Sequence, residues 1–113
     1  ESLFTFWEDV YFSFKAKKMS FDLSRTDLVK LKHGGGKTTK KDARYTSYYF
    51  QRNRLIVSPL LVQNKMKRKI IQCNTIKEIL MLLIQKLIRG DWVRGKNLFL
   101  ALKDALFFKH DLR

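Results

Sequence analysis

Apolar residues between positions 74 and 106 recur every three or four residues, with one interruption at 89–91. The first run has apolar residues at 76, 79, 80, 83, 84, 87 and 88, and it follows Thr75, a good helix N-cap with Glu78 three residues on. Gly90 can adopt the left-handed backbone that ends a helix, and Asp91 can cap the next helix. The pattern therefore predicts two helices that are antiparallel neighbours, because the turn between them is very short.

One face of each predicted helix is expected to pack against the other. The expected packing residues are Leu83, Leu87, Trp92, Phe99 and Leu102. Gly95 has no side chain one turn before Phe99, so the partner helix can approach closely there. We interpret Trp92 as the wedge between the helices, and the alternative is a hot spot for binding a partner. If Trp92 is buried, its replacement by Ala is expected to cost about 3 to 5 kcal/mol.

The rest of the chain divides by composition into three parts. Residues 1–31 form an aromatic-rich N-terminal segment, in which Phe4, Trp7, Tyr11 and Phe14 make a helical stripe that is expected to pack on this domain or on a partner. Residues 32–41 form a basic, glycine-rich linker, which lacks the spacing of a phosphate-binding loop. Residues 42–113 form a helical repeat-like domain. The fold class predicted is all-α, with antiparallel helix pairs in a tetratricopeptide-like repeat or a fragment of one.

A further helix is predicted over residues 43–57, capped by Asp42 and ended before Pro59. Tyr45, Tyr48 and Tyr49 share one face of this helix. We interpret them as core residues, and the alternative is a surface on which nucleic-acid bases stack.

The charge of the chain changes this picture most. Among its 113 residues, 24 Lys and Arg oppose 10 Asp and Glu, a net charge of +14. Residues 30–69 hold twelve basic residues and one acid, hence +11 of that total. An anionic partner is expected to neutralise such a charge, and nucleic acid is the commonest one. The candidate nucleic-acid-binding residues are Lys37, Lys40, Lys41, Arg44, Arg52, Arg54, Lys65, Lys67, Arg68 and Lys69. The cluster at 65–69 could instead be a nuclear-import signal or a solvated helix face.

The residue types that carry out catalysis do not occur at spacings that suggest an active site. The two histidines lie far apart, the serines lack a nucleophile-elbow context, and no pair of carboxylates suggests acid–base chemistry. Cys73 is the only cysteine and is interpreted as a buried, inert thiol. The apolar run at 79–88 is too short and too polar for a membrane span. We expect no enzymatic activity, no metal or other cofactor, no small-molecule substrate and no membrane partner.

The stretch Arg89-Gly90-Asp91-Trp92-Val93-Arg94-Gly95-Lys96-Asn97-Leu98-Phe99 resembles the opening of a tetratricopeptide-like repeat. Together with the Arg-rich helix before it, over residues 52–102, it is similar to the tetratricopeptide-like subunit of the RNA polymerase I core factor, of the selectivity factor one family. Gly95 stands where that pattern usually has Ala.

The resemblance implies a non-catalytic scaffold subunit of a transcription initiation factor, in the nucleus and nucleolus. Such a subunit would recruit RNA polymerase I to ribosomal DNA promoters and contact DNA phosphates through basic helices. Its partners would be a subunit resembling transcription factor IIB, a β-propeller subunit, the TATA-binding protein and nucleic acid, DNA in preference to RNA. The alternative function is an RNA-binding structural protein of a ribosomal or ribosome-assembly particle.

Overall fold

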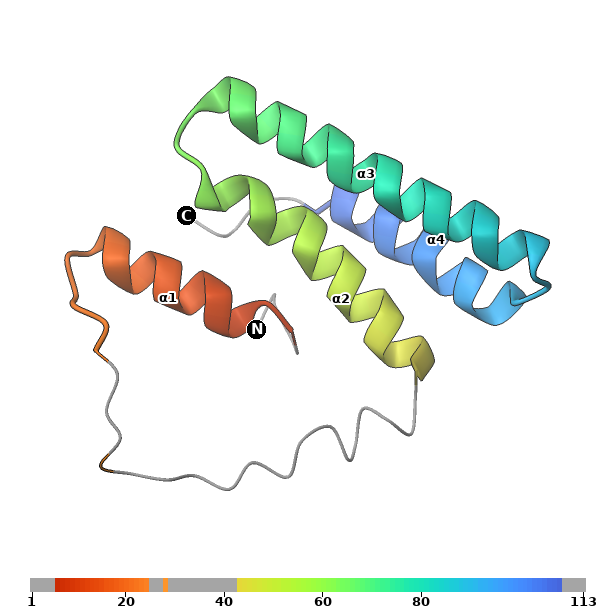
Figure 1. The fold of residues 1–113 in the computed structure, drawn as a ribbon, viewed down its shortest axis with the longest axis horizontal. Coiled ribbons are helices and arrows are strands. Elements are labelled where there is room, and N and C mark those ends of the chain that lie inside the picture. The colour runs from red at the N-terminus through yellow and green to blue at the C-terminus, as the bar shows by residue number, and fades with distance from the viewer. Residues whose placement is uncertain (1–5, 25–27, 29–42, 109–113) are drawn as a thin grey trace.

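The computed structural model of the chain describes residues 6–24, 28 and 43–108, and every regular element in this part is a helix. The elements are α1 (Glu8–Lys18), α2 (Ala43–Val57), the 3-10 helix η2 (Ser58–Leu61), α3 (Lys65–Ile88) and α4 (Trp92–Leu106). In Figure 1, α3 and α4 lie side by side and antiparallel, and α2 lies between this pair and α1. The all-α fold and its antiparallel helix pair are confirmed.

The turn between α3 and α4 has the chemistry that the sequence predicts. Gly90 has a positive φ of 71°, and the side chain of Asp91 accepts a hydrogen bond from the backbone N–H of Arg94 at 3.3 Å. Gly95 is buried, and a Cβ at this position would lie 3.0 Å from Cδ2 of Leu87 and 3.8 Å from Cδ1 of Leu83. The close approach of the two helices at Gly95 is therefore confirmed.

The core lies where α2 meets the α3–α4 pair. Leu55 of α2, Ile79 of α3 and Leu98 of α4 are buried together, and Ile76, Leu82, Leu83, Leu102 and Ala105 pack around them. This confirms Leu83 and Leu102 as packing residues. Helix α2 begins and ends where predicted, and Pro59 follows it within η2. Asp42, its expected cap, lies outside the described residues.

The predicted start of α3 at Thr75 is wrong, because an earlier cap takes precedence. The side chain of Asn64 accepts hydrogen bonds from the backbone N–H groups of Met66 at 2.9 Å and Lys67 at 3.2 Å, so the helix begins at Lys65. Thr75 is buried inside the helix, where its hydroxyl donates to the carbonyl oxygen of Ile71 at 2.9 Å. Cys73 was expected to be buried and is exposed, since it lies two residues from Thr75 and thus on the opposite side of the helix.

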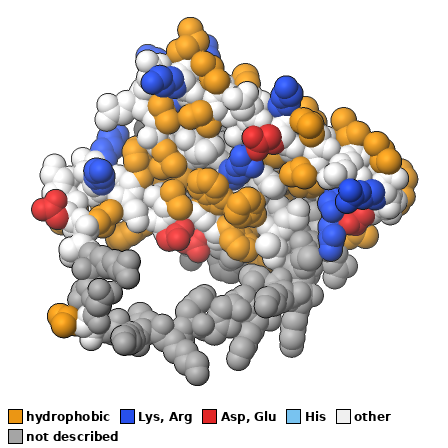
Figure 2. Space-filling model, viewed as in Figure 1, with side chains coloured by type: hydrophobic (Ala, Val, Ile, Leu, Met, Phe, Trp, Pro, Cys, Tyr) orange, Lys and Arg blue, Asp and Glu red, His pale blue; other side chains and the backbone are white. Residues whose placement is uncertain are grey.

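Trp92 and Phe99 do not pack between the helices as predicted. They are 69% and 55% exposed, and Leu87 is partly exposed although it touches Gly95. Phe99 follows the buried Leu98 by one residue, which turns its side chain about 100° around the helix. Trp92 lies seven residues before Phe99 and so shares its side of α4. Figure 2 shows other hydrophobic side chains that reach the surface, and the exposed ones include Met81, Ile84 and Ile88 of α3.

Two aromatic residues just before α1 attach it to α2. The rings of Phe6 and Trp7 pack against Phe50, with centroid distances of 6.0 and 6.1 Å. Both residues have positive φ, 63° and 67°, a conformation that costs on the order of 1 kcal/mol or more for a non-glycine residue. The side-chain amide of the fully buried Asn53 donates to the carbonyl oxygen of Phe6 at 3.1 Å. We call these contacts the aromatic anchor.

The predicted stripe continues along α1. Trp7, Tyr11 and Phe14 are half-buried, whereas Phe12 is exposed, so the stripe faces the rest of the chain. Phe4, its predicted first member, lies outside the described residues. A role of this stripe in binding a partner subunit stays a prediction.

Candidate nucleic-acid interface

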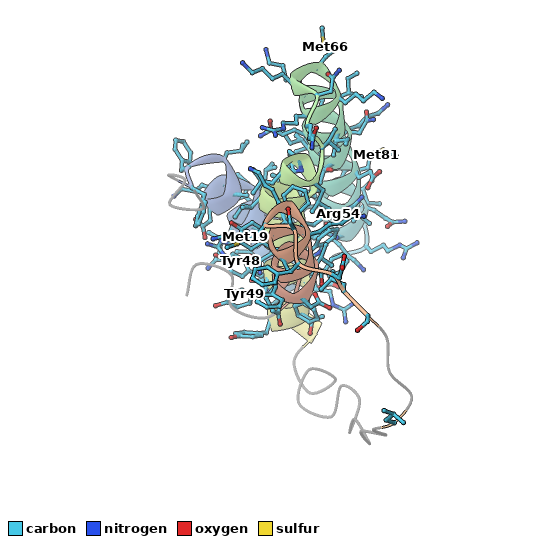
Figure 3. All side chains as sticks on the ribbon, turned by 90° about the vertical axis from the view of Figure 1, so that its left-hand side faces the viewer. Met19, Tyr48, Tyr49, Arg54, Met66 and Met81 are labelled. Carbon is cyan, nitrogen blue, oxygen red and sulfur yellow. The ribbon has the colours of Figure 1, made fainter. Side chains whose placement is uncertain are left out.

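A cleft of about 910 Å³ lies between the C-terminal end of α1, the α2–α3 connection and the first turns of α3. Its apolar part consists of Tyr11, Phe14, Met19, Leu60 and Leu61. Its polar part consists of Lys15, Lys17, Lys18, Gln63 and Arg68, and none of the described residues that line it is acidic. Figure 3 looks at this side of the molecule, where Met19 marks the end of α1 and Met66 the start of α3 above it. We call this site the basic cleft.

The start of α3 contributes positive charge where a helix disfavours it. Lys65, Lys67 and Lys69 are exposed, and Arg68 reaches the cleft; the first turn has no acidic residue. The N-terminus of a helix carries a partial positive charge, so each cation there is unfavourable by a few tenths of a kcal/mol up to about 1 kcal/mol. A bound anion would remove that penalty.

Arg68 is held in place at the edge of the cleft. Its Nε donates to the carbonyl oxygen of Val62 in the α2–α3 connection. This bond uses one of the five N–H donors of the guanidinium group. The bond fixes the position of the charge, and a planar guanidinium suits bidentate binding of phosphate.

The lysines of α1 are functional candidates that sequence reasoning missed. Lys15, Lys17 and Lys18 occupy the last turn of α1, where they also complement the negative end of the helix. They lie about fifty positions before Arg68 in the sequence, and the fold brings both groups to one cleft. Only the high charge of the chain pointed to them, because their local pattern is that of an ordinary helix end.

Two of the predicted nucleic-acid-binding arginines have contacts within the domain. Arg54 pairs with Glu78 of α3 at 2.5 Å, so it joins α2 to α3. The guanidinium of Arg52 lies 5.1 Å from the ring centroid of Phe108 and donates to the side-chain oxygen of Asn53 at 2.9 Å. These contacts give both arginines a structural role. Lys37, Lys40 and Lys41 lie outside the described residues, and so does the side chain of Arg44.

The three tyrosines of α2 lie at a second, more open cleft of about 650 Å³ between α2 and α4. It is lined by Tyr45, Tyr48, Tyr49, Val93, Lys96, Asn97 and Leu100. Tyr45 is 41% exposed, so its interpretation as a core residue is corrected, whereas Tyr48 and Tyr49 are half-buried. Figure 3 shows Tyr48 and Tyr49 on the side of α2 opposite Arg54. We call this site the tyrosine pocket.

One wall of the tyrosine pocket is fixed by a short hydrogen bond between helices. The hydroxyl of Tyr48 donates to Oδ2 of Asp104 on α4 at 2.5 Å. Burial first, and then the hydrogen bond and the charge of Asp104, raise the pKa of Tyr48 to about 12. The phenol therefore stays protonated well above neutral pH, and its hydrogen bond ties α2 to α4.

Other kinds of site find little support in the part of the chain that the structure describes. No group of three or more His, Cys, Asp or Glu residues there could hold a metal ion. Among the same residues, no helix combines the length and the apolar character needed to cross a bilayer. The chemistry of the site is therefore that of lysine and arginine side chains beside aromatic and aliphatic ones.

Comparisons with known proteins were made at the level of families, of single proteins and of structures. None of them adds support to the resemblance to a tetratricopeptide-like family, which rests on the residues quoted for it in the sequence. No family model, no curated protein and no solved structure matches this chain.

Proposed function

We propose that this chain is a non-catalytic helical module that binds nucleic-acid phosphates in the basic cleft. The observation that carries the proposal is that Lys15, Lys17 and Lys18 of α1 meet Arg68 of α3 around one cleft, where no acidic residue lines it within the part of the chain that the structure describes. Cations this close repel one another, and a phosphate backbone offers the anionic charges that would relieve the repulsion.

The start of α3 extends this surface. Lys65, Lys67 and Lys69 are exposed beside Arg68, and the helix N-terminus adds its partial positive charge. Contacts of this kind position a protein on nucleic acid and do not read its sequence. Sequence preference, if the protein has any, must come from other residues or from partner subunits.

We propose further that the module is a scaffold subunit of a transcription initiation factor that recruits RNA polymerase I to ribosomal DNA promoters. The resemblance of residues 52–102 supports this assignment. So do the exposed apolar side chains of Trp92 and Phe99, together with Met81 and Ile84, because large apolar residues at a surface are typical of protein interfaces.

The phosphate proposal is tested by the salt dependence of binding. We expect Lys17→Gln/Lys18→Gln and Lys65→Gln/Lys67→Gln to weaken binding of labelled duplex DNA, measured by fluorescence anisotropy between about 50 and 200 mM salt. Each phosphate contact that is lost should lower the slope of log K against log salt by about 0.9 for duplex DNA. Lys17 and Lys18 line the cleft, and Lys65 and Lys67 lie beside it at the start of α3. Each double variant should therefore lower the slope by about 2.

The matched control removes the same charge elsewhere. Lys77 and Lys103 are exposed and line neither cleft, so Lys77→Gln/Lys103→Gln should leave the slope nearly unchanged. An equal loss of slope in the control and in the cleft variants would mean that binding is diffuse. The basic cleft would then have no special role.

The assignment to a promoter factor has its own test. The tagged full-length protein is recovered from nuclear extract after nuclease treatment, and its partners are identified by mass spectrometry. Recovery of the TATA-binding protein and RNA polymerase I subunits supports the promoter factor. Recovery of ribosomal or assembly proteins that RNase releases supports the RNA-binding alternative instead, which the aromatic lining of the tyrosine pocket favours.

A further inference from the structure

We infer that the tyrosine pocket is a binding site for an unpaired nucleobase, so that the protein prefers single-stranded over duplex nucleic acid. This inference rests on the proposed function, because it adds a base site to the phosphate site. The phosphate proposal uses the cations of the basic cleft, and it does not use the tyrosines of α2, Lys96 or Asn97.

The pocket has a partly exposed aromatic side chain at its edge. Tyr45 is 41% exposed, and its ring lies 4.4 Å from that of Tyr49, with an angle of 50° between the ring planes. Tyr49 in turn meets Tyr48 edge to face at 4.8 Å. Since the hydroxyl of Tyr48 bonds to Asp104, the row of rings is supported from α4. A supported aromatic ring at a surface is a platform on which a flat ligand can stack.

The other lining residues restrict the class of ligand. Lys96 places a positive charge at the pocket, so a cationic ligand such as a methylated lysine is disfavoured. A purely apolar ligand would form no hydrogen bond with Lys96 or Asn97. Val93 and Leu100 provide apolar contact. The ligand should therefore stack on a ring, form hydrogen bonds and carry no positive charge. A nucleotide meets these three conditions, because it has a flat ring, hydrogen-bonding edges and an anionic phosphate.

The separation of the two sites along α2 and η2, taken on its own, suits a single strand that uses both sites. Tyr48 and Leu60 are twelve positions apart along α2 and η2, which corresponds to roughly 18 Å along the helix. At about 3.4 Å of rise per nucleotide, this is about five stacked nucleotides. A strand held by its phosphates in the basic cleft could therefore place a base in the tyrosine pocket. A base within a duplex could not enter without leaving its stack.

The test uses probes that differ in their bases and not in their charge. Binding of the full 113-residue chain is measured by fluorescence anisotropy with an oligothymidylate of about twelve nucleotides, an abasic oligomer of equal length and an oligouridylate. We expect the oligothymidylate to bind roughly 10- to 100-fold more tightly than the abasic oligomer, the range of one stacked base. Comparison with the oligouridylate tells whether RNA or DNA is preferred.

Variants then locate the base. Tyr45→Leu should reduce the advantage of the oligothymidylate to about 3-fold or less, and Tyr45→Phe should retain it, because stacking needs the ring and not the hydroxyl. Phe99→Leu is the matched control, since Phe99 is an exposed aromatic residue outside the pocket. Circular dichroism checks that each variant is folded.

The outcomes separate this inference from the proposed function. If the abasic oligomer binds as tightly as the oligothymidylate, with a steep salt dependence, the base site is refuted and the phosphate site stands. If no oligomer binds, both are refuted. If Phe99→Leu removes the preference and Tyr45→Leu does not, the base lies elsewhere and the tyrosine pocket is refuted as its site.

Discussion

The hydrogen bond between Tyr48 and Asp104 predicts a measurable change of stability with pH. Replacing Tyr48 by Phe removes the hydroxyl and leaves the ring in place. A hydrogen bond to a charged group contributes about 1.5 to 3 kcal/mol when it is buried. Tyr48 and Asp104 are only half-buried, so we expect Tyr48→Phe to lower the free energy of unfolding by about 1 kcal/mol at pH 7.

The pKa of Tyr48 sets the pH range of the effect. Its pKa is 10.0 when unperturbed and about 12 in the folded chain, a difference that corresponds to about 2.7 kcal/mol without screening. Solvent reduces this to about 1 kcal/mol at a half-buried site. Because the folded state holds the proton more tightly, the stabilisation is complete below about pH 10. It is lost as the pH rises toward about 12.

The assay is urea unfolding followed by circular dichroism, at pH 7 and at steps between about pH 9.5 and 11.5. The wild-type protein and Tyr48→Phe should differ most at pH 7, and the difference should shrink at each higher pH. Groups far from Tyr48 are the same in both proteins, so their contributions cancel in the comparison. Asp104→Asn keeps an acceptor without the charge and should fall between the two. Parallel stability curves for the wild type and Tyr48→Phe would refute the reasoning.

Two further substitutions test the packing. Ile79→Ala should lower the free energy of unfolding by about 2 to 5 kcal/mol, because Ile79 is fully buried at the centre of the core; a loss below about 1 kcal/mol in urea unfolding would mean that the core lies elsewhere. Trp92→Ala should cost less than about 1 kcal/mol, since the side chain is 69% exposed. A cost of about 3 kcal/mol or more by the same assay would restore the role as a wedge that its position in the sequence suggested.

Local chemistry made the turns and one helix predictable. Gly90 and Asp91 act through their own backbone and the next few residues, so their roles can be predicted without knowledge of the fold. Helix α2 ends before Pro59 for the same kind of reason. The start of α3 was missed because Asn64 and Thr75 are both competent caps. The basic residues after Asn64 resemble a solvated segment more than a first helical turn.

Which side of a helix is covered could not be predicted in the same way. Helix α4 has apolar residues over much of its circumference, and the position of α2 decides that Leu98 is buried and Phe99 is not. The extent of the candidate site could not be predicted from the sequence for the same reason. The sequence indicated the basic cluster at 65–69, but only the packing of α1 beside the α2–α3 connection adds Lys17 and Lys18 to it.

The aromatic anchor holds α1 at its N-terminal end, through Phe6 and Trp7. Lys17 and Lys18 lie at the opposite end of this eleven-residue helix, about 16 Å from the anchor. A rotation of about 10° at the anchor would therefore move them by about 3 Å, while the core of α2, α3 and α4 stays as it is. The width of the basic cleft thus depends on the packing at Phe50, which does not line the cleft, as well as on Tyr11 and Phe14, which do. A polyanion that bridges α1 and α3 would fix that width, and docking of α1 and binding of the polyanion would stabilise each other.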